Sequence, residues 1–224
     1  MKVMMTGGSG LLGRQLRKDN PSIYAPSHED MDILSQSDCA RRISDYRPDV
    51  LIHAAAFTSP PKCHERPSLA REVNIRGTIN LVNICEDMGV KLVYISTDYV
   101  FDGKKGHYDV SDPINPVNKY AETKAAGELA TRTMDNSLVI RTSFCDNIFP
   151  YPKAFVDHYT SRDYVDIIAP LIYKTATSDK LGIAHVGTER KSVYDLAKKR
   201  KPEIGQLSIS EVGFNIPADT SFAT

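Results

Sequence analysis

The sequence has no tryptophan, few cysteines and no excess charge of either sign. Lysine plus arginine and aspartate plus glutamate both number 28, so the formal net charge is zero at neutral pH. Proteins that bind nucleic acids neutralise phosphates with clustered basic side chains, and this balance excludes such an electrostatic footprint. The one basic run, Lys198–Lys201, follows a helical pattern and is interpreted as a helix C-terminus, where the dipole favours cations. We therefore expect no nucleic-acid partner.

The cysteines also show no metal-binding or disulfide motif. The four of them are widely spaced and form no Cys-x-x-Cys pair. Cys63 and His64 are adjacent, but a zinc site needs a second cysteine or histidine pair, which the sequence lacks. We expect no metal, and the absence of a disulfide framework favours a reducing compartment.

Long apolar runs are missing as well. No stretch is long enough to cross a bilayer. The segment Met1–Thr6 runs directly into glycines and lacks the long apolar region of a secretory signal. We expect a cytoplasmic protein without a membrane partner.

What remains is an ordinary globular composition arranged in an alternating pattern. The 224 residues are 41% hydrophobic and 25% charged, enough for one core and a small lobe. Short apolar runs alternate with helical spacing, which predicts an α/β fold with a Rossmann-like, doubly wound parallel sheet. The expected strands are 2–6, 22–25, 48–53, 90–95, 138–141 and 182–186, and the expected helices are 37–46, 68–88, 154–159 and 192–199, with another carrying Tyr120.

A glycine turn follows the first strand. Gly7, Gly10 and Gly13 have the spacing Gly-x-x-Gly-x-x-Gly and stand directly before a helix. In dinucleotide-binding folds such glycines allow the tight turn, the approach of backbone amides to a pyrophosphate, and close helix–strand packing. Because the turn sits between the first strand and a helix, it predicts a dinucleotide site.

The end of the second expected strand bears on the choice of dinucleotide. NAD-preferring folds place an acidic residue there to hold the ribose hydroxyls, but this chain has no acid until Glu29. Ser27 and Arg14 are instead candidates to accommodate a 2′-phosphate, so NADP(H) is favoured over NAD(H). The segment 30–34 is interpreted as a third strand or as a loop beside the adenine.

Two further segments are expected near the cofactor. Ala54, Ala55 and Ala56 end the strand 48–53, and their small side chains would let a cofactor lie against the backbone. His53, just before them, is interpreted as a packed strand-end histidine rather than a catalyst. Asn74 has two readings, a structural hydrogen bond or a role in a water relay.

Tyr120 and Lys124 carry the predicted chemistry. They stand four residues apart on one helix face, so both side chains reach the same point. A nearby ammonium group lowers the pKa of a phenol toward the working range of a proton donor. Thr97 ends the strand 90–95 at the carboxyl edge of the sheet, where its hydroxyl is placed to bond an oxygen that gains charge.

These motifs resemble the extended short-chain dehydrogenase/reductase superfamily and, within it, most closely the dTDP-4-dehydrorhamnose reductase family. The resemblance is dense up to residue 144 and thin afterwards. It is carried by Gly7-Gly-Ser-Gly-Leu-Leu-Gly13, Asp49-Val-Leu-Ile-His-Ala-Ala-Ala-Phe-Thr58, Ser96-Thr-Asp-Tyr-Val-Phe-Asp-Gly103 and Tyr120-Ala-Glu-Thr-Lys124. Dehydratases of the superfamily usually have Asp-Glu after the threonine, whereas this chain has Asp98-Tyr99, which argues against dehydration.

The resemblance implies an NAD(P)H-dependent reductase of a 4-keto nucleotide-sugar. Tyr120 would protonate the sugar oxygen, Lys124 would bind the nicotinamide ribose, and Thr97 would bond the carbonyl. The implied cofactor-binding residues are Gly7, Ser9, Gly10, Leu11, Leu12, Gly13, Asp32, Ile33, Ala54, Ala55, Ala56, Tyr120 and Lys124. The implied substrate-binding residues are Thr58, Asp98, Tyr99 and Phe144.

The chain also departs from the family. The expected division is a dinucleotide-binding domain, 1–144, and an abbreviated C-terminal substrate lobe, 145–224, partly interleaved with it. Relatives usually carry tryptophan where Phe144 stands. Arg162 is read either as a diphosphate contact or as a member of a surface ion pair. Two alternatives to the reductase stay open, a non-catalytic dinucleotide-binding regulatory subunit and a nucleotide-sugar epimerase, as does a homodimer.

Overall fold

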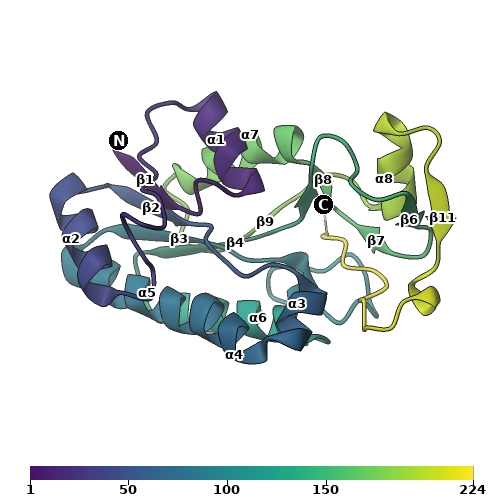
Figure 1. Cartoon of the computed structure of the whole chain (residues 1–224), viewed down its shortest axis with the longest axis horizontal. Coiled ribbons are helices and arrows are strands. Elements are labelled where there is room, and N and C mark those ends of the chain that lie inside the picture. The colour runs from purple at the N-terminus through teal and green to yellow at the C-terminus, as the bar shows by residue number, and fades with distance from the viewer. Residues whose placement is uncertain (224) are drawn as a thin grey trace.

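A parallel sheet forms the centre of the computed structural model, which describes residues 1–223 (Figure 1). Within these residues the main sheet has five strands in the order β1-β2-β3-β4-β9, every pair parallel. The strands are β1 (Val3–Thr6), β2 (Val50–His53), β3 (Lys91–Ile95), β4 (Ser137–Thr142) and β9 (Gly182–Val186). The predicted doubly wound parallel sheet is confirmed.

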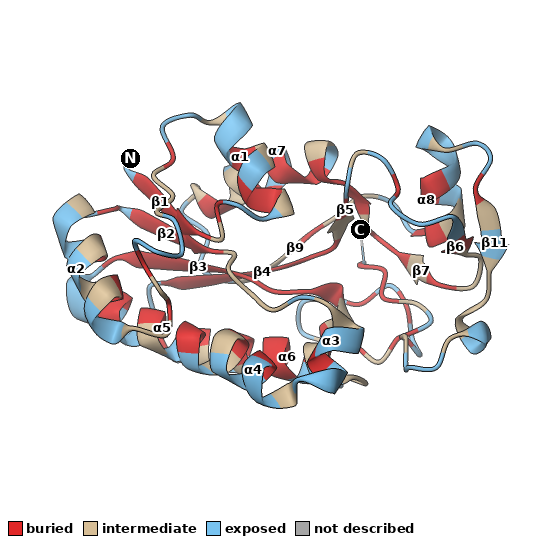
Figure 2. Ribbon diagram, in the orientation of Figure 1, coloured by how far each residue is buried: buried red, intermediate tan, exposed pale blue. Residues whose placement is uncertain are grey.

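Helices cover both faces of this sheet (Figure 1). One face carries α1 (Leu11–Asp19) and α7 (Val165–Ala176), and the other carries α2 (Gln36–Tyr46), α5 (Gly77–Met88) and α6 (Lys119–Thr131). The strands β1, β2, β3 and β4 are buried along their whole length, which Figure 2 shows as red ribbons between the helical layers, whereas the edge strand β9 is only partly buried. Parallel strands covered in this way read as unbroken apolar runs, which is why the sequence predicted them.

The core is divided between the two faces by the alternation of side chains along each strand. Val3 and Met5 pack on the face covered by α1 and α7, whereas Met4 packs on the opposite face with Leu51 and Leu92. Helices α1 and α7 therefore contribute apolar side chains to one core, and α2 and α5 contribute them to the other. The sheet between them holds the carboxyl ends of β1, β2 and β3 at a common edge.

Two predicted elements differ in detail. The strand expected at 22–25 is reduced to one bridge between Tyr24 and Met4. The segment 30–34 is a loop, which is one of its two interpretations. The helix expected at 68–88 is α4 (Pro67–Arg71), a π-helical turn and α5. π-Helical turns often occur at functional sites, and this one places Asn74 against the chain after β2.

The C-terminal third builds a smaller lobe from short strand pairs and α8 (Val193–Arg200) around its own apolar cluster. The pairs join β5 (Phe144–Cys145) to β8 (Asp163–Tyr164), β6 (Lys153–Phe155) to β11 (Gly205–Leu207), and β7 (Tyr159–Thr160) to β10 (Lys191–Ser192). Because α7 and β9 lie within the main layers, the chain crosses between the two parts more than once. The division at residue 144 stays a prediction.

The helix expected at 154–159 is wrong. Lys153–Phe155 is the strand β6, paired with residues 205–207, and a second strand begins at Tyr159. The pairing partner lies 52 residues away in register, Gly205 opposite Lys153. Tertiary pairing thus overrides the local spacing, as it commonly does for short strands.

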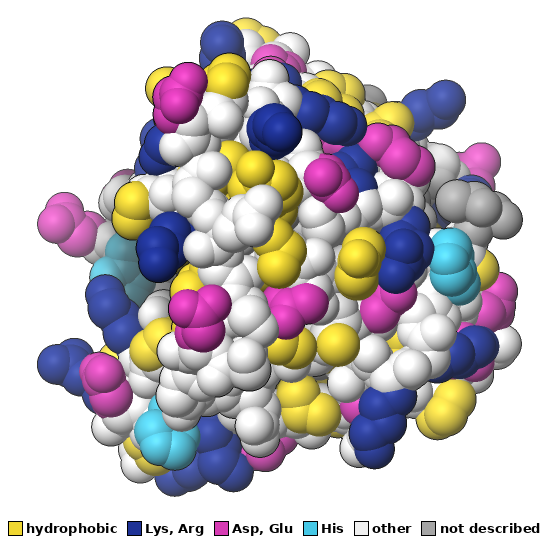
Figure 3. Space-filling view, turned by 90° about the vertical axis from the view of Figure 1, so that its right-hand side faces the viewer, with side chains coloured by type: hydrophobic (Ala, Val, Ile, Leu, Met, Phe, Trp, Pro, Cys, Tyr) yellow, Lys and Arg dark blue, Asp and Glu magenta, His cyan; other side chains and the backbone are white. Residues whose placement is uncertain are grey.

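The described residues also bear on membrane and metal binding. Between residues 1 and 223 no helix has the length and apolar character needed to span a membrane. In the same range no group of three or more His, Cys, Asp or Glu side chains is arranged to hold a metal ion. Figure 3 shows one face of the molecule, on which basic and acidic side chains are interspersed.

Candidate active site

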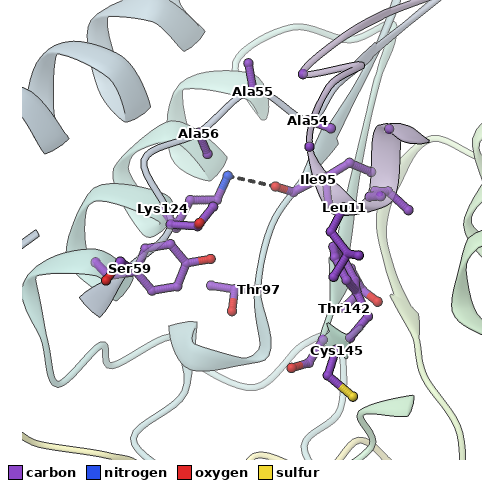
Figure 4. A pocket seen from close by; sticks show the side chains of 18 of the residues that line it. Leu11, Ala54, Ala55, Ala56, Ser59, Ile95, Thr97, Lys124, Thr142 and Cys145 are labelled. Atoms are coloured by element: carbon purple, nitrogen blue, oxygen red, sulfur yellow. Dashed lines mark hydrogen bonds between the residues drawn. The ribbon is translucent and has the colours of Figure 1, made fainter. Parts of the chain in front are cut away.

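A cleft of about 1640 Å³ runs along the carboxyl edge of the sheet, between the glycine turn and the smaller lobe. It is roomier than the sites of most single small ligands, which measure about 300–1,000 Å³. Every residue predicted to bind cofactor or substrate lines it except Asp98 and Arg14. Figure 4 shows Lys124, Thr97 and Ala54–Ala56 around the same space.

The glycine turn is built for close approach. Gly7 has a φ of +75°, and a Cβ there would lie 2.7 Å from the backbone carbon of Ala54. A Cβ at Gly13 would lie 2.3 Å from the carbonyl oxygen of Gly7. Helix α1 begins directly after Gly10, whose side chain cannot cap it. The amides of its first turn therefore have no side-chain cap, and Leu11, Leu12 and Gly13 line the cleft, an arrangement that fits the pyrophosphate of a dinucleotide.

The adenine end of the cleft differs from the prediction in one residue. Ser27 lines it, but Arg14 does not, because the Arg14 guanidinium donates to the carbonyl oxygen of Ser9 at 2.7 Å. Arg17, almost one helical turn further along α1, lines the cleft instead. An acid is present too, since Asp30 lines the cleft and accepts a hydrogen bond from Ser27 at 2.8 Å.

Lys124 is buried at the centre of the site. Its Nζ donates to the carbonyl oxygen of Ile95 at 2.7 Å (Figure 4) and lies 4.0 Å from the centre of the Tyr94 ring. Burial lowers the pKa of Lys124 to about 7, although Glu128 favours its charged form. His53 lies behind it, bonded to Thr6 and Thr78, which confirms its reading as a packed histidine.

Tyr120 faces the cleft, partly exposed, beside Thr97. Burial raises the pKa of Tyr120 above its usual value, and the neighbouring Thr97 hydroxyl only partly opposes this. The expected lowering of that pKa by Lys124 is therefore not found, because desolvation dominates and weakens the charge of Lys124 as well. A phenol with a raised pKa keeps its proton at neutral pH and so can give it away.

Asp98 is the one predicted substrate residue that the structure places elsewhere. Its side chain is buried behind the cleft and accepts hydrogen bonds from Thr97, Thr160 and Thr220. The sequence motif put Asp98 next to Thr97 and Tyr99 but did not say that its side chain points away from the cleft.

The smaller lobe supplies the opposite wall. Tyr99 packs edge-on against Tyr120, with ring centres 6.4 Å apart, and the ring of His158 lies 5.7 Å from Tyr99. Arg162 lines the cleft and donates from Nε to the hydroxyl of Ser143 at 2.8 Å, so its reading as a surface ion pair is wrong. The sequence reasoning missed further lining residues, among them Tyr151, Lys153, Phe155, His158 and Phe214.

Asn74 has a structural role. Its amide oxygen accepts from the backbone N–H of Phe57 at 2.7 Å, and its amide nitrogen donates to the Phe57 carbonyl and to Thr123. The side chain thereby ties the loop after β2 to α6. Of its two readings, the structural hydrogen bond is the one these contacts support.

The chain resembles known proteins over most of its length. Residues 1–169 match the family described as the RmlD substrate binding domain. The dTDP-4-dehydrorhamnose reductase of Aggregatibacter actinomycetemcomitans is 32% identical over 180 residues, which make up 76% of this chain and 61% of that protein. The methionine adenosyltransferase 2 subunit beta of Bos taurus is 34% identical over 148 residues, 61% of this chain and 44% of that protein.

A solved structure agrees over nearly the whole chain. The dTDP-4-dehydrorhamnose reductase of Bacillus anthracis, solved in complex with NADP, superposes with a TM-score of 0.90 at 29% identity. That superposition covers 99% of this chain and 90% of the other. The chain nevertheless spans only about half to three-fifths of the first curated relatives it matches in sequence. On the match to residues 1–169, the chain belongs to the RmlD substrate-binding domain family.

Proposed function

We propose that this chain is an NAD(P)H-dependent reductase of a 4-keto nucleotide-sugar. The observation that carries the proposal is the meeting of the uncapped glycine turn, Thr97, Tyr120 and Lys124 on one cleft. Two relatives of this chain, named dTDP-4-dehydrorhamnose reductase and dTDP-4-keto-6-deoxy-D-glucose reductase, support the proposal. A nicotinamide cofactor, when bound, supplies the hydride.

The chain's own residues have distinct roles in this proposal. The turn Gly7–Gly13 binds the pyrophosphate, and the small side chains Ala54–Ala56 let the cofactor lie against the end of β2. Lys124 bonds the nicotinamide ribose. Tyr120 gives its proton to the sugar oxygen as that oxygen gains charge, and Thr97 orients the reacting groups.

NADP(H) is the proposed form of the cofactor. Arg17 and Ser27 line the end of the cleft where the adenine ribose lies in this fold, and a guanidinium group suits a 2′-phosphate. The NADP-bound structure from Bacillus anthracis supports the same choice. The carboxylate of Asp30 at this end would repel a 2′-phosphate, but its ion pair with Arg42 at 2.9 Å reduces this repulsion.

The substrate is proposed to lie between Tyr120 and the smaller lobe. Thr58, Tyr99 and Phe144 line this part of the cleft, and Arg162 adds a cation suited to a diphosphate. Asp98 is left out, because it does not reach the cleft.

The test is the oxidation of NADPH in the presence of a dTDP-4-keto-6-deoxysugar, followed at the nicotinamide absorbance band. Tyr120→Phe removes the proton donor, and we expect turnover to fall at least about 100-fold, a typical contribution of general acid catalysis. Tyr173→Phe is the matched control, since Tyr173 lies on α7 and does not line the cleft. No turnover of any 4-keto nucleotide-sugar, or full activity in Tyr120→Phe, would contradict the proposal.

A regulatory subunit without catalysis is the second candidate. It is favoured by the similarity to the methionine adenosyltransferase 2 subunit beta, which matches as strongly as the reductases do. Purification of this chain with an enzyme partner, and cofactor binding without hydride transfer, would support it. An epimerase requires a tightly held nicotinamide cofactor, so recovery of protein free of nicotinamide would argue against that alternative.

A further inference from the structure

Asp98 joins three separate parts of the chain although it does not touch the cleft. Its Oδ1 accepts the hydroxyl proton of the neighbouring Thr97 at 3.2 Å. Its Oδ2 accepts from Thr160 on β7 at 2.9 Å and from Thr220 at 2.7 Å. All four side chains are buried, Thr160 and Thr220 completely. A buried carboxylate is stable only when such donors surround it.

Thr220 belongs to a segment, residues 217–223, that we call the C-terminal strap. Its backbone pairs on one side with Tyr159, which donates to Ala218 and accepts from Thr220 at 2.7 and 2.9 Å. On the other side it pairs with Tyr108, which donates to Ser221 at 2.7 Å and accepts from Ala223 at 2.9 Å. The strap thus lies between the loop before α6 and the smaller lobe, and it fixes the Thr220 hydroxyl against Asp98.

This arrangement decides what Thr97 can do. A hydroxyl has one proton to donate, and Thr97 gives it to Asp98. The oxygen of Thr97 in turn accepts from the backbone N–H of Tyr99 at 3.2 Å. The Thr97 hydroxyl, which lines the cleft beside Tyr120, therefore has a fixed orientation before the substrate arrives.

We propose that Asp98 is a positioning residue which fixes the orientation of the Thr97 hydroxyl beside Tyr120, and that Thr220 of the C-terminal strap holds Asp98 in place. The inference rests on the proposed function, because Thr97 orients the reacting groups there. It gives Thr220 a role in positioning Thr97 although no residue of the strap lines the cleft.

Asp98→Asn tests the direction of the hydrogen bond between residues 97 and 98. If the amide oxygen of the asparagine faces Thr160 and Thr220, its amide nitrogen faces Thr97 and donates to it. Thr97 is then the acceptor of this hydrogen bond instead of its donor. We expect kcat to fall by about 10- to 100-fold, the usual size of such supporting effects. The Kd for NADPH should not change, since Asp98 is outside the cleft.

The strap is tested by a second series that keeps Asp98. Thr220→Val removes one of the two donors to Oδ2 and should lower kcat roughly tenfold, whereas Thr220→Ser should restore it to within about twofold. Ser221→Ala is the matched control, because this buried hydroxyl in the same strap donates to Asp219 at 2.6 Å and does not contact Asp98. It should lower thermal stability and leave kcat unchanged.

The outcomes separate a structural role from a positioning role. If Thr220→Val and Ser221→Ala lower kcat equally, or if Thr220→Ser does not restore it, the inference is overturned. Expected instead is a loss of kcat confined to Thr220→Val and Asp98→Asn, with the KM for NADPH unchanged.

A measurement without turnover distinguishes this inference from the proposed function. Thr97→Val and Thr220→Val should lower the midpoint of urea unfolding by amounts that do not add, because both remove donors from Asp98. Additive losses would overturn the inference. An unsubstituted chain that turns over no keto-sugar while showing this coupling would overturn the proposed function alone.

Discussion

Tyr120 and Lys124 share one desolvated wall of the cleft, and burial pushes their pKa values in opposite directions. The pKa of Tyr120 rises and that of Lys124 falls to about 7, because both groups lose the solvation of their charged forms. The pair therefore favours an uncharged phenol that holds its proton.

Lys124 should make cofactor binding depend on pH. Its folded pKa of about 7 means that the ammonium group is present below this pH and lost above it. We expect the Kd for NADPH to rise as the pH increases from about 6 to about 9, measured by nicotinamide fluorescence. Lys124→Arg, whose guanidinium stays charged, should remove this dependence. An unchanged pH profile in Lys124→Arg would be inconsistent with the role of Lys124.

Arg17 should select the 2′-phosphate. Arg17→Ser should weaken NADPH binding about tenfold, the worth of one hydrogen bond to a charged group, and leave NADH binding unchanged. Arg14→Ser is the control, because Arg14 lies on the same helix and bonds Ser9 instead of lining the cleft. Equal losses for NADPH and NADH would show that Arg17 does not read the 2′-phosphate.

Sequence reasoning at this scale succeeded where spacing along one element determines geometry. Tyr120 and Lys124 are four apart on α6, and both line the cleft. It failed for Asp98, because a motif gives the order of residues and not the direction of a side chain. It also named Arg14 and missed Arg17, since only the orientation of α1 against the turn decides which arginine lines the cleft.

The glycine turn acts as one element with α1. Gly13→Ala would place a Cβ 2.3 Å from the Gly7 carbonyl oxygen and 2.6 Å from Gly8, both backbone atoms that cannot yield easily. We expect a loss of about 1–3 kcal/mol in the free energy of unfolding, as in overpacked cores, together with weaker NADPH binding. Urea denaturation and fluorescence titration measure the two effects.

The control is Gly213→Ala, since a Cβ at Gly213 has nothing within 4 Å. It should be neutral for both stability and binding. If Gly13→Ala proves equally neutral, the tight packing of α1 on the turn is not needed for the site.

Among the elements, strands of the central sheet were predictable because burial on both faces makes them short unbroken apolar runs. Val50–His53 and Lys91–Ile95 are examples. The smaller lobe was not predictable in this way. Strand β6 is three residues long, and it pairs with residues 205–207. A segment this short has no recognisable alternation of apolar and polar residues that would predict a strand.

The molecule as a whole should lose stability on mild acidification. Burial lowers the folded pKa values of His53 and His158 to about 3, far below the unfolded value of 6.5. Both histidines are uncharged above pH 6.5 in the folded and the unfolded chain. Below pH 6.5 they become protonated in the unfolded chain but stay neutral in the folded chain. The free energy of unfolding should therefore fall as the pH drops from 6.5 toward 3, by roughly 1.4 kcal/mol per pH unit for each histidine.

Urea unfolding at a series of pH values measures this slope. His158→Gln removes one titrating group and should make the slope shallower in the same pH range. A slope that His158→Gln leaves unchanged would show that His158 is protonated equally in the folded and unfolded chain.

The central claim is that Tyr120 gives the proton while hydride reaches the carbonyl carbon of a 4-keto nucleotide-sugar. The most direct measurement is mass spectrometry of the sugar product after reaction with NADPH deuterated at the transferred position. The account predicts that the unsubstituted chain places deuterium on the former carbonyl carbon, and that Tyr120→Phe places almost none in the same time. The account would be contradicted if no product of any 4-keto nucleotide-sugar carried deuterium, or if Tyr120→Phe transferred deuterium equally fast.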